Sequence, residues 1–132
     1  DGEFFSRVLL QAKAIKFCKK AKVYYRSGTA ESISQQKNTY QKAASLLLSY
    51  KLYAENVNSY LENTKLRKAL GNNYLNFIYQ YYPFYPDLAQ EAERSFYNLN
   101  VGKMWPVGGK KFKSLAKVIG FRNALRTRKI MG

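Results

Sequence analysis

A helical repeat of apolar residues between positions 39 and 61 limits the folds open to this chain more than any other feature. Its spacings of 4, 3, 3, 4, 3 and 4 place side chains on one helix face, and its members are Tyr40, Ala44, Leu47, Tyr50, Ala54, Val57 and Leu61. A second apolar line widens this face and consists of Leu46, Tyr53 and Tyr60. The pattern predicts a helix over 39–61 that contacts more than one neighbour.

Two later segments carry the same kind of pattern, and each has a recognisable boundary. Asn63 and Thr64 can cap a helix over 64–82, whose apolar face comprises Leu66, Leu70, Tyr74, Phe77, Ile78 and Tyr81. Pro83 and Pro86 end this helix, and Pro86 suits the first turn of the next, expected over 87–99. Three amphipathic helices with short links favour a mainly α fold, a bundle of three or more helices.

The first 34 residues follow a different pattern. A short helix is expected at 3–14, because one of its faces collects the apolar residues Phe4, Phe5, Val8 and Leu9. Glu3 lies in the first turn, where negative charge meets the positive end of the helix dipole. Apolar and polar residues then alternate, which predicts a β-hairpin with strands near 15–18 and 22–26.

The net charge of the chain and the residue types that it lacks limit the classes of function that it can have. The formal net charge is +15, from 23 basic and 8 acidic side chains, and favours anionic partners such as nucleic acid, acidic lipid or phosphorylated substrates. Histidine is absent and Cys18 is the only cysteine. These two facts exclude a Ser-His-Asp triad, a Cys-His dyad and an ordinary structural zinc site within this sequence.

The tail combines basic and apolar side chains, and no acidic residue follows Glu93. Its cations are Lys110, Lys111, Lys113, Lys117, Arg122, Arg126, Arg128 and Lys129. One apolar helix face is expected, interrupted at Gly120, and consists of Phe112, Leu115, Ala116 and Ile119. A cationic amphipathic helix with Trp105 just upstream is typical of a segment lying on an anionic membrane surface. The alternatives are a solvated basic face and, less favoured, an RNA-binding surface.

Three short motifs in the first 34 residues resemble inverting family 2 glycosyltransferases, enzymes of the GT-A type. The first motif is DGEFFSR at 1–7. It resembles a segment of that family that contains, in order, an acidic residue, any residue, a second acidic residue, two bulky residues, any residue and an arginine. IKFCKKAKVYYRSG at 15–28 is similar to its hairpin ending in Tyr-Arg, and Ser32-Ile33-Ser34 matches the Ser-x-Ser that often follows. The helices over 39–100 resemble the carboxy-terminal extensions of some bacterial members. Because no initiator methionine precedes Asp1, we expect a piece of a longer protein.

The resemblance implies a role for four residues. Asp1 falls where the family keeps its catalytic base, which removes a proton from the acceptor hydroxyl. Glu3 and Arg7 fall on the acceptor side, where Glu3 would either orient the acceptor or simply cap the helix, and Arg7 would brace the site. Arg26 falls where a basic group helps to neutralise the departing nucleotide diphosphate.

The resemblance also implies a domain organisation. Residues 1–34 would be the carboxy-terminal edge of a catalytic domain, with the helix and hairpin a remnant of a larger α/β domain. Residues 35–104 would form the helical bundle, and 105–132 the basic amphipathic tail. The nucleotide-sugar half, with its Asp-x-Asp motif, is not in this sequence, so we expect the fragment alone to be inactive and without a cofactor.

The implied partners belong to the whole enzyme. They are Mg²⁺ or Mn²⁺, a nucleotide-sugar donor, and an acceptor glycan or lipid-linked acceptor. The basic tail suits a cytoplasmic enzyme that works as a peripheral protein on the inner face of the plasma membrane. The alternative is a non-enzymatic basic helical module that binds an anionic membrane surface or RNA.

Overall fold

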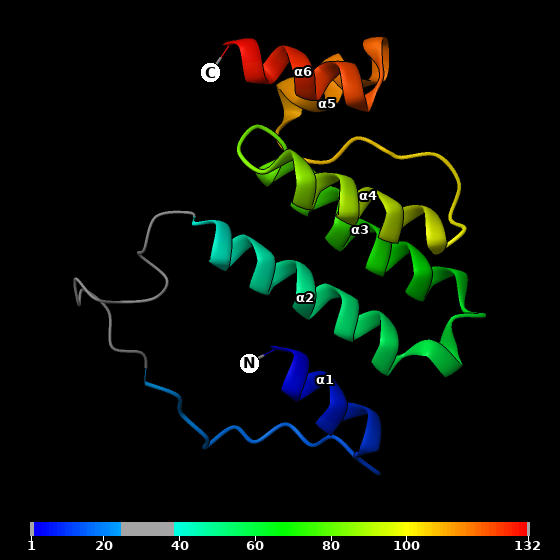
Figure 1. The fold of residues 1–132 in the computed structure, drawn as a ribbon. Helices are drawn as coiled ribbons and strands as arrows, with labels where there is room; N and C mark the ends of the chain where they lie inside the picture. The colour runs from blue at the N-terminus through cyan, green and yellow to red at the C-terminus, as the bar shows by residue number, and fades with distance from the viewer. Residues whose placement is uncertain (1, 25–38, 132) are drawn as a thin grey trace.

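The computed structural model describes residues 2–24 and 39–131 (Figure 1). In these residues it contains six α-helices and one 3₁₀-helix, which are α1 (Gly2–Gln11), α2 (Tyr40–Asn56), η1 (Asn58–Tyr60), α3 (Thr64–Tyr81), α4 (Pro86–Asn98), α5 (Lys110–Ile119) and α6 (Phe121–Met131). The predicted mainly α class is therefore confirmed, as is the helical bundle.

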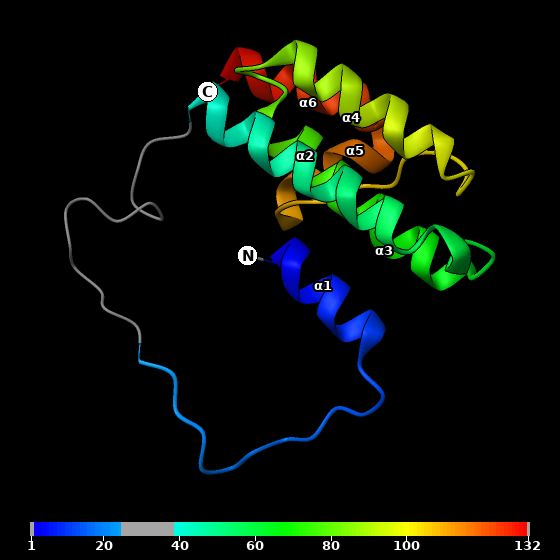
Figure 2. The ribbon, with the colours of Figure 1, turned by 60° about the horizontal axis from the view of Figure 1, so that its bottom comes forward.

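The predicted β-hairpin is wrong for the residues that can be described. Residues 12–24 run as an extended chain with a turn at Lys19-Lys20 and no strand in this range (Figures 1 and 2). Ile15, Phe17 and Val23 expose 75–89% of their surface. The alternation of apolar and polar residues indicates which side chains would share a face of a strand. A two-stranded hairpin, however, also needs another element to pack against for stability. Residues 25–26, the end of the expected second strand, lie outside the described residues.

The bundle core lies between α2, α3 and α4. Its fully buried members on these helices are Ala43, Leu47, Leu70, Tyr74, Leu75, Phe77, Ile78, Tyr81, Leu88, Ala89, Ala92 and Phe96. Leu47 and five residues of α3 (Leu70, Tyr74, Phe77, Ile78 and Tyr81) belong to the two apolar stripes given above, since a 3.6-residue period directs one face of each helix inward. The predicted helix over 39–61 is shorter than expected, because α2 ends at Asn56 and a 3₁₀ turn follows.

Side-chain caps fix where two bundle helices begin. The Thr39 hydroxyl accepts a hydrogen bond from the Lys42 backbone N–H at the start of α2. The Asn63 side chain accepts bonds from the N–H groups of Lys65 and Leu66, at 2.9 and 3.3 Å, at the start of α3. These bonds satisfy backbone donors that have no partner inside the helix.

Gly71 allows the segment after α4, which contains Trp105, to pack closely against α3. This residue is buried, and a Cβ added there would lie 2.9 Å from the Trp105 ring and 3.2 Å from the Phe96 ring. Trp105 packs edge-on against Phe96, and its indole N–H donates to Asn72 Oδ1 at 2.7 Å. Gly71 weakens α3 by about 1 kcal/mol relative to alanine, but it makes room for two aromatic rings.

Helices α5 and α6 form a hairpin on one end of the α3–α4 pair (Figures 1 and 2). Gly120 separates them with φ of 84°, which confirms the predicted interruption. Phe112 contacts the rings of Tyr79 and Phe121, at centroid distances of 4.8 and 5.8 Å. The apolar faces of both helices therefore belong to the protein core, with Ala116, Ala124 and Leu125 also buried.

Candidate functional site

Helix α1 packs against α2 through small and polar residues. A Cβ at Gly2 would overlap the Tyr53 hydroxyl, so glycine allows the two helices to approach closely. One helical turn further, Ser6 Oγ lies 3.5 Å from Asn56 Nδ2. Figures 1 and 2 both show α1 beside the second half of α2.

Glu3 has polar contacts with both helices of this pair. Its Oε1 atom accepts a hydrogen bond from Asn56 Nδ2 at 3.0 Å and pairs with Arg7 Nε at 2.7 Å. Arg7 also donates to Oε2 at 3.3 Å, and its guanidinium lies 5.9 Å from the Phe4 ring centre. The bonds from Asn56 and then Arg7 lower the pKa of Glu3, so it is a carboxylate at neutral pH.

The opposite face of α1 is apolar and exposed. None of the α1 side chains, all of which are described, is fully buried. The large apolar residues of α1 and of the extended segment after it expose between 40% and 89% of their surface. They are Phe4, Phe5, Val8, Leu9, Leu10, Ile15, Phe17, Val23 and Tyr24. Exposed apolar surface of this extent marks a place where another molecule or domain packs.

The four residues predicted to form a catalytic site divide into two pairs. Glu3 and Arg7 are described, and the structure joins them in one ion pair. Asp1 and Arg26, the predicted base and diphosphate ligand, lie outside the described residues. Asn56 was missed because it follows Glu3 by 53 positions and belongs to no motif.

The basic residues of α5 and α6 form an outward-facing cationic surface. Its exposed members are Lys110, Lys111, Lys113, Lys117, Arg122 and Arg126. The side chain of Lys129 is not among those described. Most apolar side chains of the hairpin pack inward, so its charged side chains are free to meet a partner, together with the exposed apolar residues Val118 and Ile130.

Two arginines of α6 make contacts within the fold. Arg128 lies 4.1 Å from the Tyr79 ring centre and donates to the Tyr79 carbonyl at 2.5 Å. Arg122 pairs with Glu93 of α4, and this bond raises the pKa of Arg122. Both arginines therefore help to hold the hairpin on the bundle. Trp105 is half-buried against Phe96, so its indole ring supports the core.

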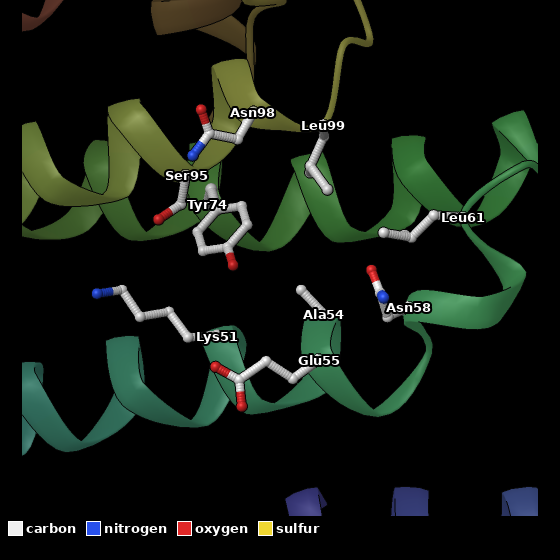
Figure 3. A pocket seen from close by; sticks show the side chains of 9 residues that line it. All are labelled: Lys51, Ala54, Glu55, Asn58, Leu61, Tyr74, Ser95, Asn98 and Leu99. Atoms are coloured by element: carbon white, nitrogen blue, oxygen red, sulfur yellow. The ribbon is translucent and has the colours of Figure 1, made fainter.

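A shallow cleft of about 500 Å³ lies between α2 and the α3–α4 pair (Figure 3). The Tyr74 hydroxyl points from α3 toward α2 and donates to the Tyr50 carbonyl at 3.3 Å. Burial raises the pKa of Tyr74, so the hydroxyl stays protonated at neutral pH. Lys51 pairs with Glu91, whose backbone carbonyl accepts from Ser95 Oγ at 3.1 Å. Tyr74, Lys51 and Ser95 each have a polar partner within the bundle. We therefore assign the cleft to the stability of the bundle.

A metal site and a membrane-spanning helix are both absent from the part of the chain that the structure describes. No three of its Cys, Asp and Glu residues come close enough together to hold a metal ion. None of its helices has the length and apolar character that crossing a membrane requires. No protein family model, curated protein or solved structure matches this chain.

Proposed function

We propose that this chain is the acceptor-side edge and carboxy-terminal helical region of an inverting glycosyltransferase. The whole enzyme would transfer a sugar from a nucleotide-sugar donor to the hydroxyl of a glycan or lipid-linked acceptor. The observation that carries the proposal is the exposed apolar surface of α1 and residues 12–24. This surface falls within the 34 residues that carry the three motifs.

The exposed surface favours an enzyme of at least two parts. Helix α1 uses its small and polar residues against α2 and leaves Phe4, Phe5 and Leu9 more than half exposed. Full burial of such a side chain from full exposure contributes about 1.5–3 kcal/mol. These three are only about half exposed, so a domain that covered them would gain roughly half of that from each. We propose that the cover is the α/β domain that binds the nucleotide sugar.

In the proposed mechanism each residue has one task. Asp1 removes the proton from the acceptor hydroxyl as the oxygen attacks the sugar, and a single base suffices because inversion needs no covalent intermediate. Glu3 is held as a carboxylate by Asn56 and Arg7, so it can orient the acceptor. Arg26 neutralises the departing diphosphate. The described residues do not fit a metal site, so Mg²⁺ or Mn²⁺ belongs to the proposed α/β domain.

The test is transfer by this chain joined to its donor-binding domain. Changing Asp1→Asn is expected to lower the transfer rate by about 10²–10⁴-fold, the usual contribution of a positioned base. The control is Asp87→Asn, the same chemical change on α4. Full activity of Asp1→Asn would remove Asp1 from the role of base, and an upstream sequence without an α/β domain would end the proposal.

A second candidate function has its own observation, the cationic surface of α5 and α6. We propose that this surface binds the anionic face of a membrane, which would place the protein on the inner face of the plasma membrane. Deleting the tail would uncover the core, because Phe112 and Phe121 are buried. The better test replaces Lys110, Lys113 and Lys117 together with glutamine.

Sedimentation with phosphatidylserine vesicles measures the effect. Each basic residue contributes about 1 kcal/mol near an anionic membrane, so the triple variant should bind roughly 100-fold more weakly. The matched control replaces Lys65, Lys68 and Lys103, which are exposed and lie outside the hairpin. Equal binding of both variants contradicts this proposal, and salt-dependent binding of labelled RNA without vesicle binding would assign the surface to nucleic acid.

A further inference from the structure

A second cleft lies where α6 meets the bundle, away from α1 and its motifs. It has a volume of about 320 Å³ and is lined by residues of α3, α4 and α6 and by Met104. This volume is at the lower end of the range for small-molecule sites. All residues that line the cleft lie between positions 78 and 126. An inference about the cleft therefore does not depend on the proposed glycosyltransferase function.

The floor of the cleft is apolar. It is made by buried side chains, namely Ile78, Ala89, Phe121 and Leu125, with Met104 half-buried beside them. An apolar chain that entered would displace water from apolar surface, which is favourable. A purely polar ligand would gain little from this floor.

The rim of the cleft carries an unbalanced positive charge. Arg122 and Arg126 both line it and lie four residues apart on α6. Glu93 neutralises Arg122, whereas no described residue pairs with Arg126. A guanidinium beside an apolar cleft binds a phosphate or carboxylate with two parallel hydrogen bonds.

We propose that this cleft binds one amphipathic anion, with an alkyl or acyl chain on the apolar floor and a phosphate group on Arg126. The charge of the rim and the apolarity of the floor match the two ends of such a molecule. The ligand could come from a membrane or be free in solution, and the experiment separates the two sources.

Titration with monomeric decyl phosphate, below its micelle concentration, tests the proposal. Binding is followed by NMR of ¹³C-methyl methionine, because Met104 lines the cleft. The Met104 signal should shift, and Arg126→Gln should weaken binding by about tenfold. The matched control is Arg94→Gln, an exposed arginine of α4 outside the cleft.

Ala89→Leu provides a second variant, since the larger side chain fills the floor and should abolish binding while circular dichroism confirms the fold. Phosphatidic acid vesicles that shift Met104 as decyl phosphate does would identify a membrane source, and response to the monomer alone would identify a free ligand. Three results would overturn the proposal. They are equal binding of decyl maltoside, equal binding of inorganic phosphate, or no effect of Arg126→Gln.

Discussion

Asn56 Nδ2 donates a hydrogen bond to Glu3 Oε1 at 3.0 Å and so joins the last residue of α2 to the first turn of α1. Together with the close approach at Gly2, it sets which face of α1 meets the bundle. The polar side of α1 is used inside this chain. The apolar side is left for another part of the protein or another molecule.

The first prediction concerns the pKa of Glu3. In the folded chain this pKa lies below its usual value of 4.5, chiefly because Asn56 donates to the carboxylate. The resulting stability is present above pH 4.5 and is lost as the pH falls through the lowered pKa. Asn56→Ala should move the pKa of Glu3 back toward 4.5, measured by ¹³C NMR of the carboxyl group.

The control for this experiment is Asn98→Ala, which removes an exposed amide of α4. It should leave the titration of Glu3 unchanged. An unchanged pKa in Asn56→Ala would show that the bond between α1 and α2 does not form in solution.

The second prediction concerns Gly71. Alanine is the better helix former by about 1 kcal/mol, yet its Cβ would press on the rings of Trp105 and Phe96. Since overpacking costs about 1–3 kcal/mol, Gly71→Ala should lower the free energy of unfolding by up to about 2 kcal/mol. Urea unfolding followed by Trp105 fluorescence measures it. Gly109→Ala, where nothing lies within 4 Å, is the matched control. A gain in stability for Gly71→Ala would contradict the packing.

The third prediction separates the arginines of α6. Arg128→Gln removes a contact with the Tyr79 ring and a charged hydrogen bond to its carbonyl, and should destabilise the fold by about 1–2 kcal/mol. Arg126→Gln changes the same charge at an exposed position and should leave stability within about 0.5 kcal/mol. Thermal unfolding compares them, and equal values would mean that Arg128 does not hold α6 in place.

The fourth prediction concerns the break between α5 and α6. Gly120 has φ of 84° and ψ of 155°, a conformation open almost only to glycine. No atom lies within 4 Å of a Cβ added there, so Gly120→Ala should cost about 1–3 kcal/mol through backbone strain alone. Urea unfolding measures the cost, with Ser114→Ala on the exposed side of α5 as control. A neutral Gly120→Ala would show that the two helices can join into one.

The bundle helices could be predicted because their sequences contain both a period and local boundary signals. Asn63 and Pro86 act within one helical turn of themselves, so the starts of α3 and α4 follow from neighbouring residues. The separation of α5 from α6 at Gly120 also follows from one residue. Whether a β-hairpin forms could not be predicted in this way. The alternation of apolar and polar residues is visible in residues 15–24, but the element that a strand there would need to pack against is not.

The sites were less predictable, because they depend on contacts distant in sequence. The stripe of α5 predicts an amphipathic helix, but not whether its apolar face meets a membrane or Tyr79 of the bundle. The pairing of Arg122 with Glu93 joins two charges 29 positions apart, and no local pattern marks it. The cleft beside Arg126 exists only once α6 has docked.

The packing of Phe112, Phe121 and Leu125 into the main core affects how the protein is made. Because a chain leaves the ribosome amino end first, the α3–α4 pair emerges before the residues that cover its far end. The apolar side chains of that end stay open to chaperones, or to wrong partners, until α6 has been synthesised. Slow translation between α4 and α6 would therefore lengthen the period in which the nascent protein can aggregate.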